Sequence, residues 1–220
     1  DGYDKIYKWL IENDKYYNFC ISYKDYETYK RDGANVDKLL VCPNGAQHRD
    51  YHFTEKPLKP SWTLYLGRIE PRKRQYLYQD IYGVEFVGKY TDTTSFDRNR
   101  DCYLGQWEHE YKLQHVTDYG NMMLLSDGEN GTPLVIKEAL VAGLGVVVSK
   151  YAAHDLDTSL PFVTVIPDDK WEDIEYVQKK LIENRKISVT MRKEIRQYGV
   201  DNFSWQKLVK TYVENIEGME

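Results

Sequence analysis

The stretch that decides the fold is Ser126-Asp127-Gly128-Glu129-Asn130-Gly131-Thr132-Pro133-Leu134-Val135-Ile136-Lys137-Glu138-Ala139-Leu140. It predicts the end of a strand, a glycine-rich turn and a helix over Pro133–Ala142. We expect Thr132 to be the N-cap residue and Pro133 to take the first helical position, where its missing N–H costs nothing. Gly143 follows the last periodic residue and is expected to end the helix.

The start of this helix is suited to an anion, because free N–H groups and positive partial charge gather there. Glu138 lies in the second turn, and its neighbours on the same face are all apolar. These neighbours are Leu134, Val135, Val141 and Ala142. A lone carboxylate on a buried face needs a partner, and two hydroxyls of a ribose would satisfy its two oxygens.

The composition is that of an ordinary globular protein, with 41% hydrophobic and 30% charged residues. A net charge of −5 with interspersed signs argues against non-specific nucleic-acid binding. No apolar run approaches the roughly 20 residues that span a bilayer, and Asp1–Trp9 does not resemble a signal peptide. An odd, sparse set of cysteines (Cys20, Cys42 and Cys102) fits a reducing compartment. We therefore expect a cytoplasmic protein without a transmembrane segment.

Strand and helix patterns alternate along the chain, which predicts a doubly wound α/β fold with a parallel, Rossmann-like sheet. The expected strands are Asn18–Ile21, Lys38–Cys42, Trp62–Leu66, Val84–Val87, Asp101–Leu104, Met122–Leu125, Val146–Val148 and Phe162–Ile166. The expected helices are Tyr3–Glu12, Lys24–Asp32, Lys73–Ile81, Glu108–Tyr119, Pro133–Ala142, Trp171–Asn184, Val189–Tyr198 and Ser204–Glu217. The proline-containing stretch Tyr51–Ser61 marks a boundary, and the part before it holds too few strands for a domain of its own.

Ligands of such sheets sit at the carboxyl ends of the strands. One strand end is followed by Gly67-Arg68-Ile69-Glu70-Pro71-Arg72-Lys73-Arg74, whose basic side chains suit phosphate oxygens. A solvated basic loop explains the same residues equally well. Another strand end is followed by Gly105-Gln106-Trp107, which suits the edge of a nucleobase or, equally, local packing of the indole.

Several other chemistries lack their signatures in this sequence. The five histidines (His48, His52, His109, His115 and His154) show no metal-ligand spacing. The sequence contains no nucleophile elbow, no G-x-G-x-x-G and no P-loop lysine motif. We therefore expect no metal site.

Three segments match motifs of one enzyme family in order and spacing. They are Leu66-Gly67-Arg68 with Lys73 (family "G-R-…-K"), Asn130–Ala139 (family E-G-x-P-x-V-x-x-E-A), and Phe203-Ser204-Trp205 (family "F-S-W"). Pro43-Asn44-Gly45 adds weaker support as the "P-N-G" that leaves the N-terminal domain. The chain thus resembles the C-terminal donor-binding half of retaining GT-B glycosyltransferases of the family 4 group.

The resemblance implies metal-independent transfer of a sugar, with retention, from a nucleotide diphosphate sugar to an acceptor hydroxyl. A UDP- or GDP-linked sugar is then the donor substrate rather than a cofactor, and the acceptor is a glycan, lipid or protein. Residues 1–55 match the end of the N-terminal acceptor domain plus a linker. Residues 56–220 match the donor-binding domain, with a final helix over 204–217. The rest of the acceptor domain is expected in cis or in a partner chain.

The resemblance also assigns roles to residues. Arg68 and Lys73, beside Gly67, match the diphosphate clamp, and Glu138 matches the ribose-binding glutamate. The loop Gly105–Trp107 matches the place of the base. Backbone N–H groups of the turn and helix start meet the sugar and phosphates, and this segment contains Gly131, Thr132, Pro133, Leu134 and Val135. Arg68, Lys73, Asn130 and Glu138 are the catalytic candidates.

Asn130 is a departure, because the family has its first glutamate at this position. Asn130 keeps a hydrogen-bonding role without the charge, or the neighbouring Glu129 takes its place. This departure keeps two other functions open: a non-catalytic nucleotide-sugar-binding or interaction module, and a nucleotide-sugar epimerase.

Overall fold

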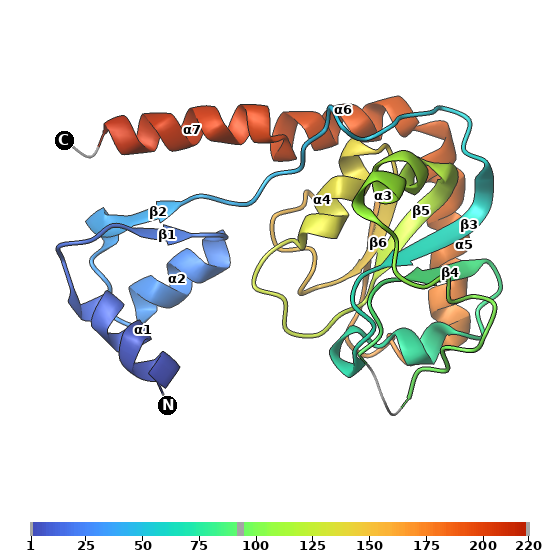
Figure 1. Cartoon of the computed structure of the whole chain (residues 1–220), viewed down its shortest axis with the longest axis horizontal. Coiled ribbons are helices and arrows are strands. Elements are labelled where there is room, and N and C mark those ends of the chain that lie inside the picture. The colour runs from blue at the N-terminus through green and yellow to red at the C-terminus, as the bar shows by residue number, and fades with distance from the viewer. Residues whose placement is uncertain (1, 92–94, 219–220) are drawn as a thin grey trace.

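The computed structural model describes residues 2–91 and 95–218, which form a small and a large lobe (Figure 1). The small lobe contains α1 (Gly2–Glu12), β1 (Asn18–Cys20), α2 (Tyr23–Arg31) and β2 (Leu39–Val41). Its two strands pair in parallel, with Asn18 opposite Leu39. Ser22 begins α2 as an N-cap, because its hydroxyl accepts a hydrogen bond from the Asp25 N–H at 3.0 Å.

The large lobe is built on a five-stranded sheet, and every strand pair in it is parallel. Its strands, in the spatial order β4-β3-β5-β6-β7, are Val84–Val87, Lys59–Leu66, Tyr119–Leu124, Gly145–Ser149 and Val163–Ile166. All residues of β4, β5 and β6 are buried, as expected for strands covered on both faces.

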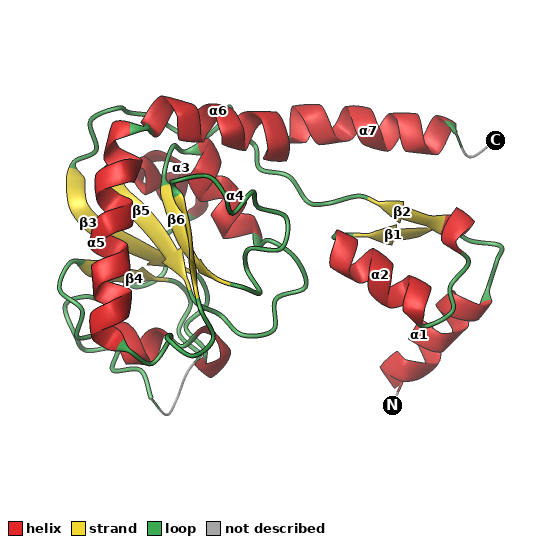
Figure 2. Cartoon of the chain, turned by 180° about the vertical axis from the view of Figure 1, so that it is seen from behind, coloured by secondary structure: helices red, strands yellow, loops and turns green. Residues whose placement is uncertain are grey.

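Helices cover both faces of this sheet, which confirms the doubly wound α/β fold. The long α5 (Ile174–Thr190) lies on one face against β5 and β6, and α3 (His109–His115) and α4 (Leu134–Val141) lie on the other (Figures 1 and 2). Next along the chain, α6 (Arg192–Phe203) packs against α4. The last helix, α7 (Trp205–Glu217), leaves the large lobe and runs back toward β2.

The chain passes between the lobes at two places, and these places touch. Ala46 in the first passage and Ser204 in the second form an isolated parallel bridge. Near it, the hydroxyl of Tyr212 on α7 donates a hydrogen bond to the carbonyl of Pro43. The connecting segment is fixed to the large lobe by Arg192, whose Nε donates to the Thr54 carbonyl at 2.9 Å.

Two expected elements of the large lobe are wrong. Instead of a helix over Lys73–Ile81, the chain forms two 3-10 turns, Pro71–Lys73 and Gln75–Tyr78. Arg74 separates them with a left-handed φ of 57°, which no helix tolerates. Asp101–Leu104 is not a strand, since this segment contributes only an isolated bridge between Tyr103 and Phe86.

The start of α4 also differs from the expectation. Pro133 is the N-cap residue and Leu134 begins the helix. Thr132 does not cap it, because its hydroxyl accepts a hydrogen bond from the Asp155 N–H at 3.0 Å. The expected end is confirmed: Gly143 has φ of +84°, and the next N–H, that of Leu144, donates to the Ala139 carbonyl at 2.9 Å.

Candidate functional site

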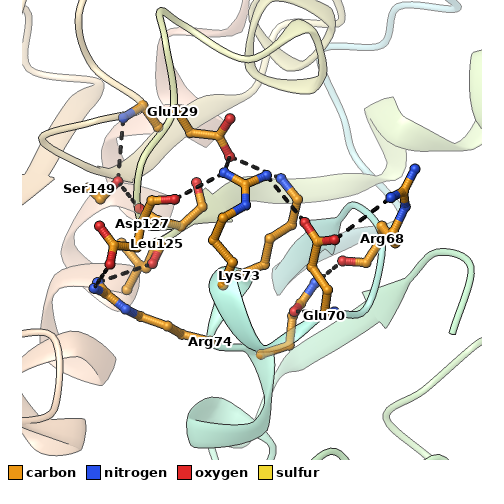
Figure 3. A network of polar contacts seen from close by, with 12 residues as sticks. Arg68, Glu70, Lys73, Arg74, Leu125, Asp127, Glu129 and Ser149 are labelled. Atoms are coloured by element: carbon orange, nitrogen blue, oxygen red, sulfur yellow. Dashed lines mark hydrogen bonds and ion pairs between the residues drawn. The ribbon is translucent and has the colours of Figure 1, made fainter. Parts of the chain in front are cut away.

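The basic loop after β3 and the glycine-rich turn after β5 lie together at the carboxyl ends of their strands. The Asp127 N–H donates to the Arg72 carbonyl, and the Arg72 Nη1 donates to the Asp127 carbonyl, both at 2.9 Å. A further ion pair joins Arg74 Nη2 to the Asp127 carboxylate at 3.4 Å (Figure 3). Two sequence segments that were singled out separately therefore form one site.

Glu129 lies at the centre of this site. Its Oε1 is 3.1 Å from Lys73 Nζ and 3.1 Å from Arg72 Nη1 (Figure 3). Burial by itself would raise the pKa of Glu129, but the neighbouring Ser126 side chain and the charges of Lys73 and Arg72 hold it below its ordinary value. The two cations thus hold an oxyanion at this place.

A change of Glu129 to glutamine is expected to reduce the acid sensitivity of the fold. Because the pKa of Glu129 is lowered by folding, its contribution to stability is present above its ordinary value of 4.5 and disappears as the pH falls through the folded value. The free energy of urea unfolding should therefore differ most between wild type and Glu129→Gln near pH 7, and the two should converge once the pH lies below the lowered pKa of the folded protein. Glu175→Gln, at an exposed glutamate of α5, is the matched control. A difference that does not shrink in acid would contradict the ion-pair account.

The turn leads into α4, whose first residue, Leu134, lines a cavity. The cavity has a volume of about 380 Å³ and is lined by Ile21, Asn44, Arg72, Gly128, Glu129, Asn130, Gly131, Thr132, Pro133, Leu134 and Lys137. The Thr132 N–H already donates to the Asp155 carboxylate at 3.0 Å. Within residues 2–91 and 95–218, no group accepts a hydrogen bond from the N–H of Leu134 or Val135. These two amides remain available for a ligand oxygen.

The small lobe holds the turn in place from the other side. The Ser22 hydroxyl donates to the Asn130 carbonyl at 2.6 Å, and Lys24 Nζ donates to the Glu129 carbonyl at 3.0 Å. Gly131 has φ of +142°, and a Cβ there would approach Ser22 Cβ to 2.8 Å. Close contact between the lobes therefore requires glycine at this position. Asn130 contributes its carbonyl oxygen to these contacts.

Glu138 is buried on α4 and points away from solvent. Its Oε1 forms an ion pair with Lys112 Nζ of α3 at 2.8 Å. Its Oε2 is buried without a hydrogen-bond partner among the described residues, and so is the hydroxyl of Tyr51. Burial, and next the charge of the Glu138 carboxylate, raise the pKa of Tyr51. One oxygen of Glu138 is thus unsatisfied, although Lys112 supplies a partner that the sequence reasoning missed.

Other expected site residues lie apart from this centre. Arg68 is largely exposed, and its guanidinium is 3.8 Å from the Glu70 carboxylate. Gly105, Gln106 and Trp107 follow the bridge at Tyr103, and Gln106 and Trp107 line a different surface cavity of about 440 Å³. The Trp107 ring packs against Tyr111 with ring centroids 5.2 Å apart, so local packing accounts for it.

The structure adds three residues to the site: Ser22, Lys112 and Asp155. Asp155 lies in the loop after β6, so the rule that ligands gather at strand ends points to its segment but not to its role. The sequence around Ser22 and Lys112 does not indicate that they belong to the site, because their partners are far away in the chain. Among the described residues, no group of three or more His, Cys, Asp or Glu side chains is placed to hold a metal ion. None of the described helices is long and apolar enough to cross a membrane.

Comparison with known proteins shows the fold. No protein-family model and no curated protein sequence matches the chain. Among solved structures, it is similar to HepE from Anabaena in complex with UDP-glucose, with a TM-score of 0.69, 14% identity, and coverage of 91% of this chain and 63% of that one. It is also similar to sucrose-phosphate synthase from Thermosynechococcus elongatus, with a TM-score of 0.73 and 16% identity over 100% of this chain and 62% of that one.

A third similar structure is the lipopolysaccharide outer core galactosyltransferase WaaB, with a TM-score of 0.69 and 17% identity over 93% of this chain and 62% of that one. These similarities confirm the expected fold, which is the Rossmann-like C-terminal half of a GT-B architecture. The chain spans a little over three fifths of the length of these structures.

Proposed function

We propose that this chain is the donor-binding part of a retaining glycosyltransferase. In this proposal the donor is a sugar linked to a nucleoside diphosphate, and the sugar passes to an acceptor hydroxyl. The diphosphate lies against Arg68, Arg72, Lys73 and the open amides of α4, and Glu138 binds the ribose. The similarity of the fold to HepE with bound UDP-glucose supports a nucleotide-sugar donor.

The observation that carries the proposal is the place of the Glu129 carboxylate. Two cations hold it at 3.1 Å each, beside a cavity that is lined by Leu134, the first residue of α4, whose amide is unpaired. Carboxylate and phosphate oxygens both accept hydrogen bonds from the planar guanidinium of arginine and from the ammonium of lysine. A diphosphate oxygen therefore suits the place that the carboxylate occupies. Donor binding then requires Glu129 to turn away from Lys73.

The same cations suit the chemistry of transfer. When the bond between the anomeric carbon and the diphosphate oxygen breaks, negative charge grows on the leaving nucleoside diphosphate. Preorganised donors stabilise that charge without reorganising, and each typically contributes about 3 kcal/mol, or about a hundredfold in rate. Arg68, which is exposed and only loosely paired with Glu70, is free to move onto the diphosphate.

Glu138→Gln is expected to weaken binding of the donor nucleotide about a hundredfold, because a carboxylate accepting from two ribose hydroxyls loses about 3 kcal/mol when its charge is removed. The measurement is calorimetric titration with UDP, GDP, UDP-glucose and GDP-mannose. Glu175→Gln is the control, and thermal unfolding checks that Glu138→Gln remains folded after losing its ion pair with Lys112.

A second titration tests the same contact without changing the protein. Wild type is expected to bind the 2′-deoxy form of its preferred nucleotide about tenfold more weakly than the ribose form, since one hydroxyl is missing. Unchanged affinity both for the variant and for the deoxy nucleotide would exclude Glu138 as the ribose ligand. Absence of any nucleotide binding by wild type would refute the donor site as a whole.

Nucleotide-sugar binding without transfer is the second candidate. The ion pair between Lys73 and Glu129 favours it, because a cation of the proposed diphosphate clamp is already occupied. Incubation of the chain with a radiolabelled nucleotide sugar, followed by separation of free sugar, epimer and transferred product, distinguishes binding alone from transfer and from epimerisation.

A further inference from the structure

Lys137 is a buried lysine that the proposed donor site does not use. Only 2% of the residue is exposed, and it lies on α4 directly before Glu138. Its Nζ donates to the Asn44 carbonyl of the connecting segment at 3.0 Å and lies 5.6 Å from the centre of the Phe203 ring. Burial lowers the pKa of Lys137, and the charge of Asp155 opposes that effect.

This buried ammonium has no counter-ion at contact distance. Across the described ranges of the chain, no carboxylate lies within 4.0 Å of Lys137 Nζ. One carbonyl oxygen satisfies one of its three donors. A buried charge without a contacting partner is costly, and the charge of Asp155 compensates that of Lys137 only from beyond ion-pair distance.

Lys137 lines the cavity beside the proposed diphosphate site. It also lines a second cavity of about 410 Å³, so it lies on the wall between the two. Among the described residues that line the first cavity, Glu129 is the one acid, and Arg72 and Lys73 already neutralise it. Asp155 and Asp157 line the second cavity with Lys137, so acids face the ammonium from that side. On the side of the first cavity, where a sugar attached to the diphosphate would lie, no described acid is left to balance its charge.

We propose that Lys137 is a specificity-determining residue that selects a donor sugar carrying a carboxylate, a hexuronic acid. This inference rests on the proposed function, because it requires the diphosphate to be held beside the same cavity. The sugar carboxylate accepts hydrogen bonds from the two remaining donors of Lys137, which replaces its missing counter-ion. A neutral hexose leaves the ammonium without one.

A structural role and a role in sugar selection predict different effects of changing Lys137. A lysine that only ties α4 to the connecting segment through Asn44 would affect stability and treat all donor sugars alike. A lysine that selects a carboxylate must change the ratio of two affinities. That ratio is insensitive to a general loss of folded protein, so it separates the two roles.

The test is competition between UDP-glucuronate and UDP-glucose for the full chain, measured by calorimetry with UDP as the reference. If the calorimetric titration with UDP and GDP shows that the chain prefers the guanosine nucleotide, the three ligands are GDP-mannuronate, GDP-mannose and GDP instead. Wild type is expected to prefer the uronate by at least about tenfold, as a charge-assisted hydrogen bond at a buried site provides. Lys137→Met should abolish this preference and bind UDP as wild type does, whereas Lys137→Arg should retain part of it.

Lys179→Met, at an exposed lysine of α5, is the matched control and should keep the wild-type preference. Equal affinity of wild type for the uronate and the hexose would overturn the inference while leaving the donor site intact. A parallel loss of UDP affinity in Lys137→Met would also overturn it and make Lys137 a structural tie. If no nucleotide binds to wild type, the proposed function fails first, and the inference fails with it.

Discussion

Gly88→Ala is expected to prevent cooperative folding of the large lobe. Gly88 follows β4 with φ of +154°, and a Cβ at this position would lie 1.9 Å from the Gly67 carbonyl oxygen and 2.6 Å from its carbon. Backbone atoms cannot move aside as a flexible side chain can, so the loop after β3 must leave its place. We expect destabilisation of more than about 4 kcal/mol, seen as loss of a sigmoidal urea transition monitored by circular dichroism.

The control for this prediction is Gly33→Ala in the small lobe. Gly33 also has a positive φ, of +97°, but no atom lies within 4 Å of the position that its Cβ would take. This variant isolates the conformational cost of about 1 kcal/mol from the cost of the clash. A Gly88→Ala protein that unfolds at the same urea concentration as Gly33→Ala would show that the two loops do not approach as closely as described.

Arg192→Met is expected to destabilise the fold by about 3–5 kcal/mol. Only 2% of Arg192 is exposed, and its guanidinium donates to the carbonyls of Thr54, Tyr119 and Thr117 at 2.9, 2.9 and 2.6 Å. Methionine fills a similar volume but leaves these buried carbonyl oxygens unpaired. Urea unfolding followed by tryptophan fluorescence measures the loss.

The connecting segment should be released first in this variant, because Thr54 is held to the large lobe through the Arg192 side chain. Limited proteolysis is therefore expected to cut Arg192→Met between the lobes under conditions in which wild type stays intact. Arg49→Met, at an exposed arginine of the same segment, should change stability by less than about 0.5 kcal/mol. An equally stable Arg192→Met protein would show that water satisfies the three carbonyls.

The architecture of the large lobe was predictable because its buried strands are short apolar runs between helical patterns. β4 and β7 are found where the apolar pattern places them, and the glycine at the end of α4 has the expected left-handed conformation. The error at Asp101–Leu104 has a physical reason: an apolar segment can satisfy its backbone with a single bridge to Phe86 and then turn. The local sequence pattern does not show with how many neighbouring strands a segment will pair.

The site was less predictable than the fold, because its contacts join distant parts of the chain. The basic loop and the glycine-rich turn carry local signals, and they do lie together. Their internal pairing was not predictable, since Glu129 binds Lys73 across the site and Lys112 reaches Glu138 from another helix. Threonine is a favoured N-cap residue, yet the tertiary contact of Thr132 with Asp155 outweighs that local preference.

The bridge between Ala46 and Ser204 brings the two passages of the chain between the lobes to one place. Because both connections pass through this bridge, we expect any relative motion of the lobes to be mainly a rotation about it, which the contacts of Ser22 and Lys24 with the glycine-rich turn oppose. Such a rotation would change the distance between Ile21 and Gly131, which line the same cavity. Because the Tyr212 hydroxyl donates a hydrogen bond to the Pro43 carbonyl next to β2, we expect α7 to follow the small lobe. Fluorophores placed on α2 and α5 would report such a rotation.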